Sequence, residues 1–115
     1  MRAFLVLFLA MAAGSALAAP APDAFSGNCA SCHGVDAASS IVAPTLRGVV
    51  GRKVASLKDF DYSPALKAKG GVWTEAALDT FIKDPQAYAP GTAMPVGEAN
   101  AANRQAIIAY LKTVK

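Results

Sequence analysis

The feature that most constrains this chain is the segment GNCASCH, residues 27–33. Its two cysteines are the only cysteines among 115 residues, and the histidine that follows them is the only histidine. Two thiols separated by two residues can close a disulfide, bind a metal ion or anchor a cofactor. Each outcome requires a different fold around the segment, so the rest of the sequence has to distinguish among them.

The first 18 residues have the pattern of an export signal. Arg2 supplies positive charge, an apolar run extends from Ala3 to Ala13, and Ala16-Leu17-Ala18 places small residues where a signal peptidase reads them. We predict cleavage after Ala18, which leaves residues 19–115 as one small periplasmic domain. The alternative is a retained membrane anchor, but a bilayer span needs about 20 apolar residues, and this run ends before Gly14.

Charge says little about partners. Once Arg2 is removed with the signal, ten basic residues stand against eight acidic ones, a net charge of +2. This bias is too weak to indicate binding to nucleic acid. Export implies an oxidising compartment, where a disulfide between Cys29 and Cys32 is permitted.

The pattern of residues 19–115 predicts an all-α fold with long loops. Residues 34–58 and 85–97 hold too many glycines and prolines for regular structure, and no alternation is long enough for a sheet. Long loops in a small domain usually have a function. Short helices are expected over residues 22–32, from Ser63-Pro64 to Gly70, from Thr74 to Asp84 and after Asn100, because proline or a capping side chain marks each start.

Three kinds of site are compatible with Cys-x-x-Cys-His. A thioredoxin-like redox pair requires a βαβ context, which this sequence lacks. A structural zinc site needs four ligands, so carboxylates would have to complete the set. Attachment of a c-type haem is the third, and this motif is its signature. Two cysteines one helical turn apart can reach both vinyl groups of one porphyrin, and the histidine then lies under the iron. We favour haem, which in bacteria is attached in this way outside the cytoplasm.

A haem iron held by His33 needs a second axial ligand. Protein ligands of haem iron are His, Met, Cys thiolate and Tyr. Met1 and Met11 belong to the predicted signal peptide, so Met94 is the methionine that remains. It could instead fill a gap in the core, but it lies in the proline-stiffened loop APGTAMP, residues 89–95. We therefore predict His33 and Met94 as the two ligands, on opposite sides of one iron.

Several further motifs carry a resemblance to a known family. On these motifs, and from Phe25 to Lys115, the chain resembles the class I c-type cytochromes, in the group of mitochondrial cytochrome c and bacterial cytochrome c2. The resemblance implies a small cytochrome c fold, with four to five short helices and long loops around one haem, and with the first and last helices crossing. The motifs are CASCH (29–33), APTLRGVVGRK (43–53), DYSPALKAKGGVW (61–73), FIKDPQAYAPGTAMP (81–95) and IIAYLK (107–112).

The resemblance also implies roles for residues around the attachment motif. Cys29 and Cys32 would hold the haem covalently, with His33 as proximal and Met94 as distal ligand. The carbonyl of Pro44 would fix the other nitrogen of His33, which orients the ring.

Other positions of the family are matched farther along the chain. Arg52, Tyr62 and Trp73 match residues that hold the haem propionates, although outside this family Arg52 would be a solvated charge and Trp73 ordinary core. Phe25 matches the aromatic residue where the first and last helices cross, facing Ile107 and Tyr110.

Thr92 matches a residue that helps to hold a buried water in this family. Its usual polar companions are replaced here by Phe81 and Leu66, which implies a drier distal side of the haem.

The function implied by the resemblance is one-electron transport, not enzymatic catalysis. Ligation on both sides of the iron leaves no open site for a substrate. The expected partners are transient redox proteins at the exposed haem edge, and the expected carrier is a monomer with no lasting membrane anchor. The basic ring of mitochondrial cytochrome c is thinned, with Gln86, Ala87 and Ala93 at basic positions. Two alternatives remain open: a haem-bearing subunit of a larger dehydrogenase or oxidase, and a peroxidase-like or gas-binding haem protein.

Overall fold

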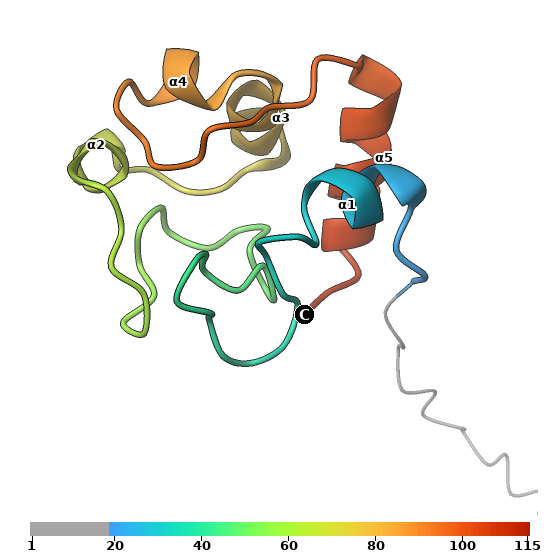
Figure 1. Ribbon diagram of the computed structural model, residues 1–115, viewed down its shortest axis with the longest axis horizontal. Helices are drawn as coiled ribbons and strands as arrows, with labels where there is room; N and C mark the ends of the chain where they lie inside the picture. The colour runs from blue at the N-terminus through green and yellow to red at the C-terminus, as the bar shows by residue number, and fades with distance from the viewer. Residues whose placement is uncertain (1–18) are drawn as a thin grey trace, which may run out of the picture.

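The computed structural model describes residues 19–115, and within this range the chain forms five α-helices (Figure 1). Extended pairing within the range is confined to one antiparallel bridge, between Lys53 and Val72. The predicted all-α fold with long loops is confirmed, whereas the predicted signal peptide lies outside the described residues. None of the helices in this range is long and apolar enough to cross a membrane. The helices are α1 Asp23–Asn28, α2 Pro64–Lys69, α3 Glu75–Lys83, α4 Pro85–Tyr88 and α5 Ala101–Leu111.

The first and last helices cross, as expected (Figure 1). Phe25 of α1 meets Tyr110 of α5 edge to face, with 4.8 Å between the ring centroids, an arrangement that aromatic pairs prefer. Ile107 of α5 is also buried, at 1% exposure. This crossing fixes the place where the chain leaves α1, and therefore where Cys29 begins the attachment motif.

Three helices begin where local signals predict. The side chain of Ser63 accepts a hydrogen bond from the backbone N–H of Leu66, Thr74 does the same for Ala77, and Asn100 for Asn103. Each cap satisfies a backbone donor that the helix leaves unpaired. Helix α3 then packs against both α4 and α5.

The prediction for the end of the first helix is wrong. Helix α1 ends at Asn28, not Cys32, and residues 29–32 form turns. The N–H of Ala30 donates to the carbonyl of Phe25, five residues back, at 3.0 Å. An α-helix has a spacing of four residues, so this last turn is wider and the helix ends here. Gly27 and Asn28 favour this ending because both are poor helix formers.

Helix α4 lies in a segment predicted to lack regular structure. Asp84 ends α3, and its carboxylate also caps α4 by accepting a hydrogen bond from Ala87 N–H at 3.1 Å. Pro85 occupies the first position of α4, where a missing N–H is tolerated. The Asp-Pro pair that signals a stop therefore also serves as a start.

The predicted loop at residues 34–58 is confirmed, and polar contacts hold it in place. Both the N–H and the hydroxyl of Ser39 donate to the carboxylate of Asp59 at 2.8 Å, and these bonds hold the pKa of Asp59 below its usual value. Farther along, the N–H of Trp73 donates to the carbonyl of Arg52 and the N–H of Gly51 to the carbonyl of Trp73, both at 2.8 Å. The loop thereby lies against Trp73, which is 5% exposed.

Candidate functional site

The attachment motif forms a tight turn directly after α1. Both thiols are free; Cys29 is half-buried and Cys32 is exposed. Burial, with a smaller effect of the nearby Glu98 carboxylate, raises the pKa of Cys29 to about 11. The cysteines of thioredoxin-like redox pairs have lowered pKa values, because the thiolate is the nucleophile. The environment of Cys29 therefore disfavours that alternative.

His33 is held by the hydrogen bond that the resemblance implies. Its Nδ1 lies 2.8 Å from the carbonyl oxygen of Pro44, so Nδ1 carries a proton and donates it to that bond. Burial lowers the pKa of His33, Arg52 lowers it further, and the bond to Pro44 opposes them. The result is a neutral imidazole with an unprotonated Nε2, the form that binds a metal.

A structural zinc site finds no support in the same region. Across residues 19–115, no group of three or more His, Cys, Asp and Glu side chains is arranged to hold a metal ion, whereas structural zinc takes four protein ligands. One oriented imidazole beside two thiols fits a metal-containing cofactor, in which most ligands of the metal belong to the cofactor itself.

Arg52 carries a buried donor without a partner. Its Nη1 donates to the carbonyl of Arg47 at 3.1 Å and its Nη2 to that of Thr45 at 3.0 Å. Its Nε is buried and has no hydrogen-bond partner among the described residues, and burial lowers the pKa of the guanidinium. Leaving such a donor unpaired costs about 1–3 kcal/mol. A hydrogen-bond acceptor that carries negative charge, such as a haem propionate, fits this position.

The structure brings the other two predicted propionate residues close to Arg52. Trp73 is joined to Arg52 by the backbone bond described above, and Tyr62 lies near enough to raise the pKa of the guanidinium. Tyr62 is 7% exposed, and its hydroxyl accepts a hydrogen bond from Leu57 N–H at 3.4 Å. The indole of Trp73 also packs on Phe81, at 5.0 Å between ring centroids.

Met94 and Cys29 are both half-buried and pack against the same hydrophobic core. The loop that carries Met94 is held by the side chain of Gln86. Its Nε2 donates to the carbonyls of Thr92, at 2.7 Å, and Met94, at 3.3 Å, while its Oε1 accepts from Gly91 N–H at 3.2 Å. Thr92 itself is buried. Gln86 was not among the predicted site residues, because a polar residue in a segment expected to lack regular structure has no distinctive signal.

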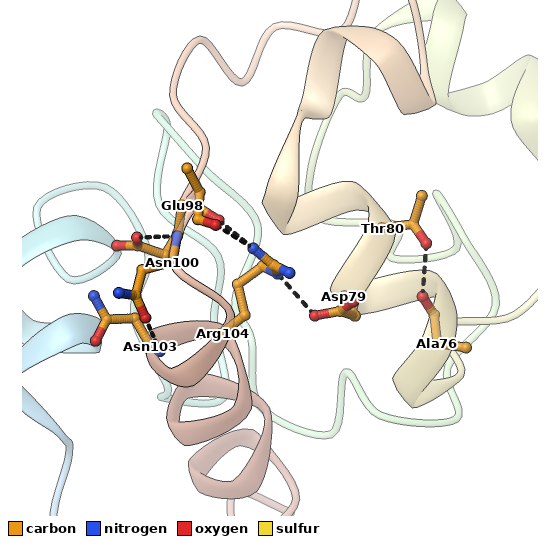
Figure 2. A network of polar contacts seen from close by, with 8 residues as sticks. Ala76, Asp79, Thr80, Glu98, Asn100, Asn103 and Arg104 are labelled. Carbon is orange, nitrogen blue, oxygen red and sulfur yellow. Dashed lines mark hydrogen bonds and ion pairs between the residues drawn. The ribbon is translucent and has the colours of Figure 1, made fainter.

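The end of this loop is fixed by α5, as Figure 2 shows. Arg104, only 6% exposed, donates from Nη1 to the carbonyls of Glu98, at 3.1 Å, and Ala99, at 2.7 Å. Its Nε bonds Asp79 of α3 at 2.8 Å. Arg104 was not among the predicted site residues, since nothing in the local sequence pattern distinguishes a buried arginine from a solvated one.

One side-chain bond connects the two halves of the site. Asn28 Nδ2 donates to Glu98 Oε2 at 2.8 Å, so the segment after Met94 lies beside the cysteine turn. His33 and Met94, although 61 positions apart in the sequence, are thus on segments that meet in space.

Comparisons with known proteins agree with this arrangement. A sequence model of the family described as cytochrome c matches residues 13–115. Cytochrome c2 iso-2 of Magnetospirillum fulvum is 41% identical over 97 residues, which cover 84% of this chain and 100% of that protein. The cytochrome c-type protein cyt cy of Rhodobacter capsulatus is 43% identical over 91 residues, 78% of this chain but 45% of that protein.

A solved structure has the same fold. Cytochrome cH from Methylobacterium extorquens has a TM-score of 0.72 and 39% identity to this chain, and the match covers 78% of this chain and 91% of the other. Together with the helical architecture and the Cys-x-x-Cys-His turn, these similarities show that the chain belongs to the cytochrome c family, whose members transfer electrons and are not enzymes.

Proposed function

We propose that this protein is an exported one-electron carrier with a single haem c, attached through Cys29 and Cys32 and ligated by His33 and Met94. The observation that supports it most is the hydrogen bond from His33 Nδ1 to Pro44, which leaves Nε2 unprotonated beside two free thiols. When bound, the haem supplies an iron centre that takes up and releases one electron.

The polypeptide's part is to hold and shield that centre. His33 keeps one ring orientation because Pro44 fixes its other nitrogen. Arg52, with its unpaired buried Nε, would bind a propionate together with Tyr62 and Trp73. Each of these three groups offers a polar hydrogen, and the guanidinium also offsets negative charge.

Met94 would be the second protein ligand of the haem iron. A methionine ligand raises the potential of haem iron, and ligation from both sides leaves no position open for substrate. Gln86 restrains the backbone of Thr92 and Met94. This restraint would help to keep Met94 as the ligand in both the ferrous and the ferric state of the iron. With Phe81 and Leu66 both buried nearby in the core, we propose a dry distal side in which Thr92 is the remaining polar side chain.

The test of this proposal is Met94→Ala in the haem-loaded protein. Haem should remain attached, while the weak sulfur-to-ferric-iron absorption band disappears. The potential should fall by on the order of 0.1 V or more, because axial ligands set haem potentials over roughly 0.8 V. Redox titration with absorption spectroscopy measures both quantities. Val96→Ala, in the same loop, is the matched control and should change neither. Survival of the band in Met94→Ala would refute Met94 as a ligand.

The alternatives have separate readouts. A peroxidase-like or gas-binding protein would bind carbon monoxide rapidly in its reduced wild-type form, whereas the carrier should bind it only after Met94→Ala. A subunit of a larger dehydrogenase or oxidase would co-purify with a fixed partner. Export with cleavage after Ala18 is tested by the N-terminal sequence of the protein from the periplasmic fraction, which should begin at Ala19.

A further inference from the structure

The peptide bond between Pro44 and Thr45 is hydrogen-bonded at both of its polar groups. Its carbonyl oxygen, on Pro44, accepts the bond from His33 Nδ1 at 2.8 Å. Its N–H, on Thr45, donates to the hydroxyl oxygen of Ser39 at 3.0 Å. The two groups belong to one delocalised amide, so a hydrogen bond at one of them polarises the other. His33 is therefore linked to Ser39 through a single peptide unit.

The chain of hydrogen bonds continues from Ser39 to the exposed carboxylate of Asp59. The hydroxyl of Ser39 donates to one carboxylate oxygen and its N–H donates to the other, each at 2.8 Å. Two donors on one carboxylate favour a single arrangement of the pair. Because these bonds hold the pKa of Asp59 below its usual value, the carboxylate carries its negative charge at neutral pH.

Every donor in this chain points toward Asp59. The imidazole of His33 donates to the peptide carbonyl, the peptide N–H donates to the hydroxyl, and the hydroxyl donates to the carboxylate. Hydrogen bonds arranged head to tail polarise one another, so a negative charge at the end of the chain strengthens each bond in it. A stronger bond at Nδ1 makes the imidazole of His33 more electron-rich, and Nε2 becomes a better metal ligand.

Further hydrogen bonds hold the middle of the chain in place. Thr45 is only 3% exposed. Its hydroxyl donates to the carbonyl of Asp36, and its own carbonyl accepts from Arg52 Nη2 at 3.0 Å. The next N–H, that of Leu46, donates to the carbonyl of Gly34 at 2.9 Å. These bonds restrain the peptide unit from turning, so a change at one end of the chain acts on the other end by polarisation.

We propose that Asp59 is a positioning residue for electron transfer, which acts on His33 through Ser39 and the peptide between Pro44 and Thr45, and that its negative charge lowers the reduction potential. The proposal rests on the function proposed above, in which Nε2 of His33 is a ligand of the haem iron. An electron-rich imidazole stabilises ferric iron more than ferrous iron, because the ferric form carries the additional positive charge.

Two other roles for Asp59 predict different results. If its charge acted only through space, the hydroxyl of Ser39 would not be needed. If the pair only tied residues 39 and 59 together, its loss would admit water to the site. Water favours the more highly charged ferric form, so the potential would then fall. The hydrogen-bond chain predicts the opposite sign, because its loss removes electron density from the imidazole of His33.

Redox titration of the haem-loaded protein tests the proposal with two variants. Asp59→Asn removes the charge but keeps an oxygen that can accept from Ser39, whereas Ser39→Ala keeps the charge and breaks the chain. At a fixed solution potential, each variant should raise the ferrous-to-ferric ratio about threefold, which is about 30 mV at about 59 mV per tenfold change for one electron.

Two further variants are the controls. Ser39→Thr retains a hydroxyl and should keep the ratio of the wild type. Asp61→Asn removes a nearby carboxylate outside the chain, whose side chain is 97% exposed and paired with Lys67 at 3.2 Å. Because such an exposed charge is screened by solvent and salt, the ratio should stay within about 1.5-fold of the wild type.

Nuclear magnetic resonance of the ferrous protein reports on the bond at His33 itself. The proton on Nδ1 should move upfield in both Asp59→Asn and Ser39→Ala, because a weaker hydrogen bond leaves this proton less deshielded. In Ser39→Thr it should stay at the position of the wild type. An upfield shift together with a higher potential places the effect at the imidazole.

An unchanged or lowered ferrous-to-ferric ratio in either Asp59→Asn or Ser39→Ala would overturn the proposal. So would an Nδ1 proton that does not move in these variants, or a rise in Asp61→Asn equal to that in Asp59→Asn. Failure of the proposed haem ligation would instead appear in the spectrum and carbon monoxide binding of the wild type, so the two proposals can fail separately.

Discussion

Gln86 shows how a single side chain can hold a loop that has no regular structure of its own. Its amide makes three hydrogen bonds to the backbone of Gly91, Thr92 and Met94. Both ends of the amide are used, so the side chain has one orientation that satisfies all three bonds. The consequence is a restrained backbone at the residue proposed as the distal ligand.

Replacing Gln86 by alanine should loosen that restraint. We expect the loss of these three hydrogen bonds to cost about 1–2 kcal/mol in the unfolding free energy of the haem-loaded protein. The sulfur-to-iron band should also weaken at a lower temperature than in the wild type, which a purely structural role would not require. Guanidinium titration and a thermal series of absorption spectra measure the two effects. Gln105→Ala, on the exposed face of α5, is the control and should change neither.

At the scale of elements, Gly97 lets the Met94 loop pass against the junction of α3 and α4. A Cβ at this position would lie 2.7 Å from the carbonyl oxygen of Lys83, 2.9 Å from that of Ile82 and 3.0 Å from Pro85 Cδ. These neighbours are backbone or ring atoms that cannot move aside. The close approach also allows Glu98 N–H to donate a hydrogen bond to the carbonyl oxygen of Ile82 at 2.7 Å.

Gly97→Ala should therefore destabilise the protein by about 1–3 kcal/mol, the usual cost of forcing atoms into a packed site. Gly27→Ala is its counterpart: nothing lies within 4 Å of a Cβ there, and alanine in a helix gains up to about 1 kcal/mol over glycine. Denaturant midpoints of the two variants should thus move in opposite directions. A neutral Gly97→Ala would show that the loop can shift away from α3.

Elements also differ in how far local sequence predicts them. The starts of α2, α3 and α5 were predictable because a cap acts within one turn of its helix. Helix α4 was missed because Asp84-Pro85 has the pattern of a stop, and its second role depends on how the chain turns after α3. The early end of α1 depends on a bond from Ala30 to Phe25, which helix propensity alone does not specify.

At the scale of the whole molecule, Arg104 connects three parts of the structure: α5, α3 through Asp79, and the end of the Met94 loop through two carbonyls (Figure 2). A buried guanidinium is tolerated only when its donors are paired. Its removal leaves the carbonyls of Glu98 and Ala99 without this donor, whereas Asp79, whose side chain is 45% exposed, can be hydrated.

Arg104→Met keeps most of the side-chain volume and removes the donors, so it should cost about 1–3 kcal/mol in unfolding free energy. The matched control is Lys112→Met, which breaks the pair with Glu75. Both partners of that pair are more than half exposed, so the expected change is within about 1 kcal/mol. Guanidinium titration of the two variants makes the comparison, and similar losses would contradict the role assigned to Arg104.

The sequence of residues 19–115 was sufficient to predict the order of motifs, the starts of α2, α3 and α5, and the candidate ligands. Caps and turn residues act over a few positions, and a chain with one histidine leaves few choices for a metal ligand. Pairings between distant segments needed the folded chain: Asn28 with Glu98, Gln86 with the Met94 loop, and Arg104 with α3. Such contacts depend on which surfaces pack together, and no pattern within a short stretch of sequence encodes that choice.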